Sequence, residues 1–273
     1  MRRFIVQAGL CCDQGEYRSE NQDNFLVDGR YMALHERSAG ANILLNSREL
    51  YQYYAVCDGM GGESAGEVAA FAAVQFLAEA LQPGTVKNQQ SLLEMLYQCN
   101  RAVCEANPEP STTSGTTLAL CCLTPQGLHI AHIGDSRVYL KSADGLQRLT
   151  ADHSRAQWLR SHQDVKPEQI AQEDEHVLTR YLGRPEQQGI RISPEIVMRR
   201  TLQAGDRLLL CTDGVHGSLP EDELQEALNN EDCLAAAQAL VGAARKQGST
   251  DNATALVIQI EHIQGGLRAL LSL

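Results

Sequence analysis

Apolar residues gather in eight strand-like segments along the chain, each five to eight residues long; some of these segments begin and end on a charged residue. Runs of this length, rich in Val, Ile, Leu and Tyr, are typical of β-strands. A shorter strand-like stretch lies at residues 24–27. We predict the eight longer strands at residues 4–11, 53–57, 116–123, 128–133, 137–141, 195–199, 207–211 and 254–260.

Short turns join several of these strands. Residues 124–127 (Thr-Pro-Gln-Gly) separate two of the predicted strands, and residues 134–136 (Gly-Asp-Ser) separate the next two. Strands connected by so few residues run antiparallel, because parallel neighbours need a long crossover. The sequence therefore predicts antiparallel sheets.

Three other segments repeat their apolar residues with the period of an α-helix. Two lie within residues 70–81 and 92–103, and each has a polar opposite face; the third lies in the Ala-rich segment 233–245. A helix with one apolar stripe packs that stripe on a sheet. Strands and helices together predict an α+β sandwich in which helices flank the antiparallel sheets.

The chain shows no internal repeat, low-complexity tract or long linker. We therefore expect one domain at residues 1–262, followed by a C-terminal tail at 263–273. Residues 152–194 have no clean period, and we expect short helices and a surface flap there. Residues 29–49 are expected to form an added loop.

The chain has 273 residues and a formal net charge of −11, which argues against a nucleic-acid partner or an anionic membrane. An anionic substrate would need a local positive charge. The nine cysteines include no C-x-x-C pair, and most lie in apolar runs, which is typical of a reducing compartment. No apolar stretch reaches the roughly 18–20 residues of a membrane span. We expect a cytoplasmic monomer.

Five aspartates occupy similar positions at strand ends. Asp58 and Asp213 each follow an apolar strand and precede Gly, whereas Asp135 lies in a tight turn between two strands. Asp251 directly precedes the last predicted strand, and Asp23 precedes the stretch at 24–27. One Asp-Gly pair is typical of an ordinary turn. Five such aspartates could instead gather carboxylates at one rim of a sheet.

Converging carboxylates repel one another and shift each other's pKa values unless cations lie between them. Mg²⁺ and Mn²⁺ prefer such oxygen ligands. Two ions sharing a carboxylate and a water activate that water for attack on phosphorus. Gly59 would allow a backbone carbonyl to approach a metal, although a tight turn also explains it. Arg18 is the candidate phosphate-binding side chain, because a guanidinium donates two parallel hydrogen bonds.

Six short motifs occur in order between residue 9 and about residue 260. They are Arg18 with Asp23, Asp58-Gly59-Met60-Gly61-Gly62, Ser114-Gly115-Thr116-Thr117, Gly134-Asp135-Ser136-Arg137, Asp213-Gly214 and Asp251-Asn252. Each motif is weak alone, but the ordered set resembles the metal-dependent protein phosphatases of type 2C, in their bacterial form. The resemblance implies two antiparallel β-sheets packed as a sandwich, with helices outside both (α-β-β-α layers), and hydrolysis of phosphoserine or phosphothreonine.

The resemblance also implies roles for particular residues at a site for two Mn²⁺ or Mg²⁺ ions. Asp58 would bridge both ions, and the Gly59 carbonyl would bind the second. Asp213 and Asp251 would complete the first, and Asp23 would hold waters of the second. The catalytic residues would then be Asp58 and Asp213 together with the arginine at position 18, which would bind phosphate.

A weaker third ion is implied between Asp135 and Asp213. The partners implied are phosphorylated proteins and an opposing Ser/Thr kinase. Three residues depart from the family pattern: Gln22 replaces an acidic residue, Met60 replaces a histidine of many eukaryotic members, and Gly217 replaces a second aspartate of the third ion.

Three alternatives remain beside this interpretation. Cys12 and Arg18 fit the C-x5-R spacing of cysteine-dependent phosphatases, although about 0.6 such matches are expected by chance in this composition. The segment Gly134-Asp135-Ser136 is similar to a trypsin-like nucleophile turn, but the glycines of an oxyanion loop do not follow it. The chain could also be a non-catalytic phosphoprotein-binding module of the same fold.

Overall fold

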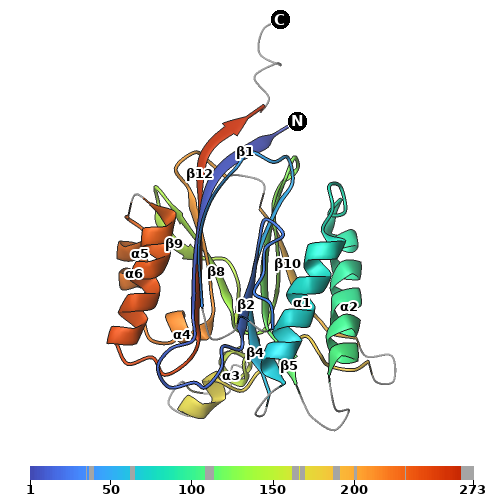
Figure 1. The fold of residues 1–273 in the computed structure, drawn as a ribbon, viewed down its shortest axis with the longest axis vertical. Helices are drawn as coiled ribbons and strands as arrows, with labels where there is room; N and C mark the ends of the chain where they lie inside the picture. Colours follow the sequence, from blue (N-terminus) through green and yellow to red (C-terminus); the bar gives the residue numbers. More distant parts are fainter. Residues whose placement is uncertain are drawn as a thin grey trace, which may run out of the picture.

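The structure is a computed structural model and describes residues 1–34, 36, 40–61, 65–107, 114–161, 166, 170–186, 191–199, 202–230 and 232–265. Two antiparallel sheets face each other, and helices cover both outer faces (Figure 1). The predicted α+β sandwich is therefore confirmed.

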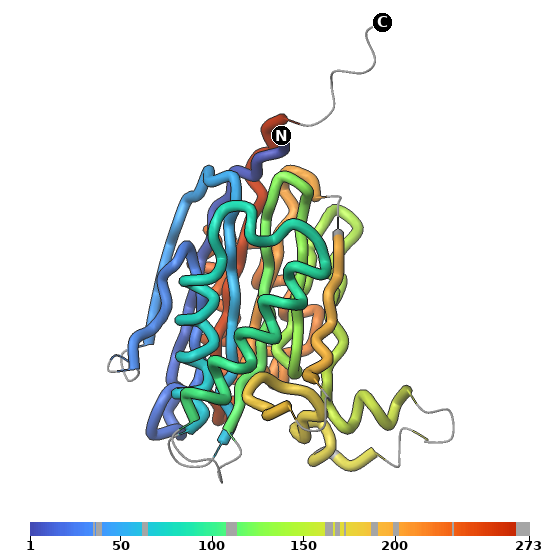
Figure 2. The backbone as a smooth tube through the Cα atoms, turned by 90° about the vertical axis from the view of Figure 1, so that its right-hand side faces the viewer, coloured from blue at the N-terminus to red at the C-terminus, as the bar shows by residue number. Residues whose placement is uncertain are grey.

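Six of the described strands form the first sheet. Its central strand β12 pairs with β1 along their whole length, from Arg3 opposite Gln264 to Asp13 opposite Ala253. The two ends of the described chain therefore lie side by side, as Figure 2 also shows. Across the sheet the strands are β3 (Ala41–Ser47), β1 (Arg3–Asp13), β12 (Ala253–Gln264), β11 (Arg207–Cys211), β8 (Arg137–Ser142) and β9 (Gly145–Arg148).

The second sheet is built around β6 and β4, and both of its edges are short strands. A further two-residue strand, β5 (Gly115–Thr116), pairs with the end of β4. Across the sheet the strands are β10 (Glu195–Arg199), β7 (Gly127–Ile133), β6 (Leu118–Thr124), β4 (Gln52–Met60) and β2 (Asp23–Val27).

Helices α1 (Gly66–Ala80) and α2 (Gln89–Ala106) cover the second sheet, and α6 (Cys233–Lys246) covers the first (Figure 1). The α6 backbone lies directly against β1, since a Cβ added at Gly9 would come within 2.1 Å of the Cys233 carbonyl carbon. The predicted helical segments are thus confirmed. Within the described residues, no helix combines the length and apolarity that a membrane crossing requires.

Alternation along the strands divides the core into layers. On β7, Leu128 and Ile130 point between the two sheets, whereas Ala131 and Ile133 point toward α1 and α2. A third cluster lies between the first sheet and α6. The chain thus builds a four-layered molecule whose connecting loops gather at the two ends.

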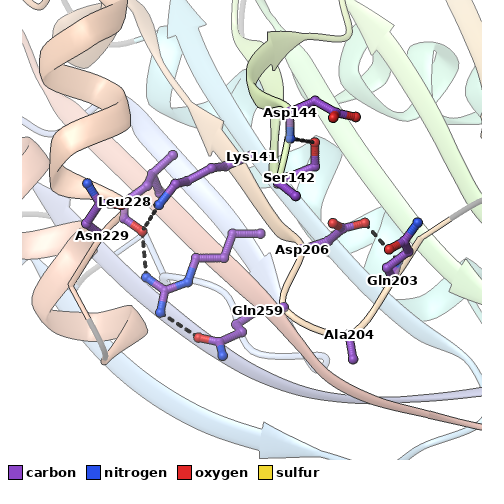
Figure 3. A pocket seen from close by; sticks show the side chains of 12 residues that line it. Lys141, Ser142, Asp144, Gln203, Ala204, Asp206, Leu228, Asn229 and Gln259 are labelled. Atoms are coloured by element: carbon purple, nitrogen blue, oxygen red, sulfur yellow. Dashed lines mark hydrogen bonds between the residues drawn. The ribbon is translucent and has the colours of Figure 1, made fainter.

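Helix α5 (Glu221–Ala227) is fastened to the first sheet by two cations that lie opposite each other on β8 and β11. Lys141 Nζ and Arg207 Nη1 donate to the carbonyl of Leu228, at 3.1 and 2.8 Å, and Arg207 Nη2 donates to Gln259 Oε1 at 2.6 Å (Figure 3). These cations meet the negative end of the helix dipole. They line a cavity of about 600 Å³, but their charge is used to hold the helix.

Two regions differ from the sequence prediction or extend it. The loop expected at 29–49 is wrong for Ala41–Ser47, which forms the edge strand β3 on β1. The region 152–194 holds α3 (Arg155–Arg160) and the 3-10 turn η3 (Gln172–Glu175), on the same end of the molecule as α4 (Asp213–His216) in Figure 1.

Strand β12 runs to Gln264, into the expected tail at 263–273. Residues 266–273 of that tail lie outside the described part of the chain, as do residues 162–165, 167–169 and 187–190 of the expected flap.

Candidate metal centre

Four of the five aspartates singled out in the sequence meet at one end of the sandwich. Asp58 lies near the end of β4, and Asp135 lies in the turn between β7 and β8. Asp213 opens α4 two residues after β11, and Asp251 lies two residues before β12. All four, with Gly59, line a cavity of about 240 Å³. We call these four aspartates the acid cluster; both sheets contribute to it.

The backbone around Asp58 is held from two sides. Its amide donates to Thr117 Oγ1 at 2.9 Å, and its carbonyl accepts from the Thr117 amide at 2.9 Å. On the other side the Gly59 amide donates to the Gln22 carbonyl at 3.1 Å. These bonds hold the backbone at the end of β4, so the Asp58 side chain extends from a fixed backbone position.

Gly59 lies beneath the start of α1. A Cβ at this position would come within 2.1 Å of the Gly66 carbonyl oxygen, so only glycine fits. Gly61 has a φ of 149°, a conformation that side chains rarely adopt. Gly62, the last residue of the predicted motif, lies outside the described residues.

Burial and mutual repulsion disturb the titration of the acid cluster. Burial, followed by the charge of Asp213, raises the pKa of Asp58 well above its ordinary value. The same two causes raise the pKa of Asp135 to about 7. The Oδ1 atom of Asp213 is buried and has no hydrogen-bond partner among the described residues. Buried carboxylates without enough donors call for positive charge.

The side chains of the cavity fit a hard divalent cation. Carboxylate and backbone carbonyl oxygens are the ligands that Mg²⁺ and Mn²⁺ prefer. The buried Asp213 oxygen without a partner is the kind of atom that a cation satisfies. The acid cluster therefore meets the chemical requirement for the predicted ions.

Asp23 lies behind the cavity wall rather than in it. It is opposite Asp58 in the β2–β4 pairing and is only 2% exposed. Its Oδ2 accepts from Thr212 Oγ1 at 2.8 Å and from Thr254 Oγ1 at 2.6 Å. Burial raises the pKa of Asp23 to about 7, against the effect of these two donors. Gln22, its neighbour, lines the cavity instead.

Arg18 reaches the cavity from the loop after β1. Its Nη2 donates to Asp251 Oδ2 at 2.7 Å, and about half of the side chain remains exposed. Asn252 fixes this loop, because its Nδ2 donates to the carbonyls of Gln14 and Glu20 at 2.7 and 3.0 Å. The predicted arginine is therefore placed where an entering anion would meet it.

Sequence reasoning missed His176, which lines the same cavity from the flap. Its Nδ1 lies 3.9 Å from Asp213 Oδ2, and the Asp213 carboxylate raises the pKa of His176. One histidine in a segment without a period carries no signal that could have identified it. His216, which the sequence also contains near Asp213, instead contacts the Asp135 carbonyl through Nε2 at 3.0 Å.

The geometry contradicts both nucleophile alternatives. Cys12 is 1% exposed, and its Sγ accepts from Asn21 Nδ2 and Thr254 Oγ1, each at 3.2 Å. Burial raises the pKa of the Cys12 thiol to about 12, so it is no thiolate at neutral pH. Ser136 is fully buried, and its hydroxyl lies 2.6 Å from Thr117 Oγ1.

A second group of metal-type side chains lies nearby, between the sheets. His132 and Glu195 are opposite each other on β7 and β10, and the ring of His153 lies 4.7 Å from that of His132. The possible donor atoms of these three residues, the histidine cluster, lie within 4.8 Å of one another.

His153, one member of the histidine cluster, offers no free lone pair to an ion. His153 Nδ1 accepts from the Gly134 amide at 3.1 Å, so the proton of the neutral ring stays on Nε2, near the Arg180 guanidinium. Neither ring nitrogen of His132 has a partner within the described part of the chain. We interpret the cluster as two neutral, packed imidazoles.

Comparison with known proteins gives one consistent result. The family model for protein phosphatase 2C matches residues 44–256. The serine/threonine phosphatase stp of Listeria innocua is 29% identical, over 96% of this chain and 98% of that protein. The serine/threonine protein phosphatase PstP of Mycobacterium tuberculosis is 30% identical, over 94% of this chain and 45% of that protein.

Solved structures agree with this. The PPM Ser-Thr phosphatase MsPP from Mycobacterium smegmatis, crystallised with cacodylate, matches with a TM-score of 0.73 at 29% identity, covering 93% of this chain and 97% of that one. The catalytic domain of PstP in complex with two manganese ions matches with a TM-score of 0.73 at 28% identity, covering 94% of this chain and 98% of that one.

Proposed function

The chain belongs to the protein phosphatase 2C family, and from this we propose that it hydrolyses phosphoserine and phosphothreonine in proteins, using water activated between two divalent cations. The observation that carries the proposal is the acid cluster, to which both sheets contribute, in one cavity with Arg18. The four carboxyl groups of the acid cluster, the Gly59 carbonyl and the Arg18 guanidinium would together bind cations and phosphate.

The chain's own residues divide the work of holding two Mn²⁺ or Mg²⁺ ions. Asp58 would lie between both ions, with the Gly59 carbonyl on the second and with Asp213 and Asp251 on the first. Asp135 would share Asp213 in holding a weaker third ion. When bound, the ions supply a hydroxide from water near neutral pH and neutralise charge on phosphate oxygens. The two manganese ions of the PstP catalytic domain support this assignment.

Arg18 orients the substrate. Its guanidinium is held at the cavity by Asp251 and remains about half exposed, so its other donors can reach an entering phosphate. Two parallel hydrogen bonds from one planar group fix both the position and the rotation of a phosphate. On a chain with a net charge of −11, this group also supplies local positive charge.

Asp23 acts from behind the cavity. Held by the hydroxyls of Thr212 and Thr254 and paired across the sheet with Asp58, it would orient waters of the second ion rather than bind phosphate. Met60 also lines the cavity and has no proton to give to the departing serine or threonine oxygen. The leaving group is therefore not protonated by the side chain at position 60.

The proposed partners follow from this chemistry. The substrates are phosphorylated proteins, and a Ser/Thr kinase would supply them. We also propose that the enzyme works in the cytoplasm, since the nine cysteines are free and eight of them are buried. We further propose that it works as a monomer.

Hydrolysis should be measured on the full chain with phosphoserine, phosphothreonine and phosphotyrosine peptides, with Mn²⁺, with Mg²⁺ and after treatment with EDTA. We expect Mn²⁺-dependent turnover of the first two peptides and loss of turnover with EDTA. Asp213→Asn should lower kcat/KM more than about 100-fold, because it removes a ligand of the ions.

Asp144→Asn is the matched control, since this exposed aspartate lies in the turn between β8 and β9 and does not line the cavity of the acid cluster. It should retain full turnover. Full turnover in the Asp213→Asn variant would contradict the proposal. Binding of phosphopeptides without turnover under every metal condition would instead indicate a phosphoprotein-binding module.

A further inference from the structure

His176 is held over the cavity by a short ladder between two arms of the flap. The Arg155 amide donates to the Val177 carbonyl at 2.8 Å, and the Thr179 amide donates to the His153 carbonyl at 2.7 Å. The His153 amide in turn donates to the Gly134 carbonyl at 2.8 Å. His176 is therefore tied by backbone bonds to the turn that carries Asp135.

Ion pairs fix the other side of this histidine. Arg160 pairs with Glu175, and Arg155 Nε lies 3.3 Å from Asp174 Oδ1, so η3 is bound to α3. The amide of His176 closes η3 by donating to the Glu173 carbonyl at 3.2 Å. The His176 imidazole thus lies on a turn that ion pairs and a backbone hydrogen bond hold in place.

The distance between His176 and Asp213 fits two ligands of one ion. At 3.9 Å, Nδ1 and Oδ2 are too far apart for a hydrogen bond. Donors at ~2.1 Å from an octahedral ion lie ~3 Å apart at a right angle and ~4.2 Å apart when opposite. The observed 3.9 Å is within the ~4.2 Å span of two donors of one ion, and Asp135 lines the same cavity.

Position 217 cannot complete such a site with this backbone. Gly217 closes α4, and its amide donates to the Asp213 carbonyl at 2.7 Å. A Cβ added there would come within 2.7 Å of that same carbonyl oxygen. A side chain at 217 is therefore excluded unless the helix end moves, and the third ion must find another protein ligand.

We propose that His176 supplies this ligand, so that the third ion is held by Asp135, Asp213 and the imidazole nitrogen of the flap. The proposal rests on the proposed function, because it concerns the third ion of that same centre. It gives the described part of the flap a defined role, which is to supply one nitrogen donor to the ion.

A nitrogen donor changes which cation the third position selects. Imidazole binds transition metals well, whereas Mg²⁺ is held almost entirely by oxygen. The two tighter positions offer only oxygen and would accept either ion. The third position should therefore prefer Mn²⁺ to Mg²⁺ more strongly than the other two.

The test is carried out on the full chain, and bound Mn²⁺ itself serves as the spectroscopic probe of its ligands. Pulsed electron paramagnetic resonance detects ¹⁴N bound directly to Mn²⁺, and the other proposed ligands of all three ions are oxygen atoms. We expect no nitrogen coupling with two equivalents of Mn²⁺ and a clear coupling with excess Mn²⁺. His176→Gln should abolish the coupling and weaken the third ion at least ~10-fold, and Mg²⁺ should displace that ion more readily than in the unchanged chain.

His262→Gln is the matched control, because this exposed histidine of β12 lies at the other end of the sandwich. It should leave the coupling unchanged. Coupling that survives His176→Gln, or a third ion without coupling in the unchanged chain, would overturn the proposal. In either case two tight ions and turnover would leave the proposed function standing, whereas loss of both would overturn the two together.

Discussion

The acid cluster and the histidine cluster lie on two sides of one turn and respond to burial in opposite ways. Asp135 in that turn faces the cavity, whereas Gly134 donates its amide to the ring of His153 between the sheets. Burial raises the pKa of Asp135 to about 7 and lowers the pKa values of His132 and His153 to about 3 and about 4. Burial favours the neutral form in both clusters.

The consequence differs because neutral imidazoles need no counter-charge, whereas crowded carboxylates do. The two neutral rings pack against each other between the sheets. Four carboxyl groups that share one cavity hold more negative charge than their donors compensate. The same physical effect therefore gives an inert core on one side of the turn and a cation receptor on the other.

The largest effect is expected from a substitution in the acid cluster. Asp58→Asn should lower turnover more than about 100-fold, since the variant lacks the carboxylate that we propose lies between the two ions. In EDTA the same variant should be more stable than the unchanged chain, because burial and the repulsion from Asp213 no longer act on a charged group at this position. Urea unfolding and phosphopeptide hydrolysis measure the two effects.

Activity and stability should thus change in opposite directions at this one position. Asp144→Asn, remote from the cavity, should change neither by a measurable amount. A metal-free Asp58→Asn chain that is less stable than the unchanged chain would contradict the idea that these carboxylates repel one another.

An intermediate effect concerns the histidine cluster and pH. In the unfolded chain a histidine takes up its proton near pH 6.5, whereas folded His132 does so only near pH 3. Between these values the unfolded state binds more protons, so the free energy of unfolding falls by ~1.4 kcal/mol for each pH unit that is lost. Above pH 6.5 this penalty is absent.

His132→Leu should remove this contribution, so that the free energy of unfolding falls less steeply as the pH is lowered. Urea unfolding between pH 7 and pH 4 measures this. The acid cluster of the metal-free chain has the opposite sign. Asp135, with a pKa near 7 against 3.8, stabilises the folded chain as pH falls and loses that effect as pH rises through 7. His262→Leu, which replaces an exposed histidine, serves as control. If the free energy of unfolding of His132→Leu fell as steeply with pH as that of the unchanged chain, burial of His132 would not be the cause.

The smallest effect is expected at Cys12, which touches neither cluster directly. Cys12→Ser should leave turnover within about twofold of the unchanged chain, and it should lower the free energy of unfolding by about 1 kcal/mol through poorer packing of a buried site. Steady-state kinetics and urea unfolding check this. A folded Cys12→Ser chain without turnover would restore the cysteine nucleophile that the geometry argues against.

The sequence predicted most strands and all three long helices, because their apolar periods are regular. It missed β3, whose apolar run Ile43-Leu44-Leu45 is short and lies between two asparagines; because β3 is an edge strand, Leu44 is exposed. It also could not predict that β1 pairs with β12, because that register joins residues about 250 positions apart. Local pattern predicts an element, but pairing depends on the whole chain.

The candidate site was predicted unevenly for a similar reason. The acid cluster and Arg18 belong to motifs with fixed spacing, and the structure brings them together in one cavity. Spacing says nothing about depth, so the position of Asp23 behind the wall was not foreseen. His176 belongs to no motif; only the folding of the flap against Gly134 brings it near Asp213.

The pairing of β1 with β12 has a consequence for how the chain matures. On a ribosome β1 is made first, yet its partner β12 is the last of the described strands and lies between β1 and β11. The first sheet therefore stays split until β12 has been synthesised, and contacts of such long sequence separation form slowly. Asp251, two residues before β12, joins the cavity at the same late stage. A nascent or truncated chain without this strand thus lacks both a continuous sheet and a complete acid cluster, which couples the onset of phosphatase activity to the synthesis of β12.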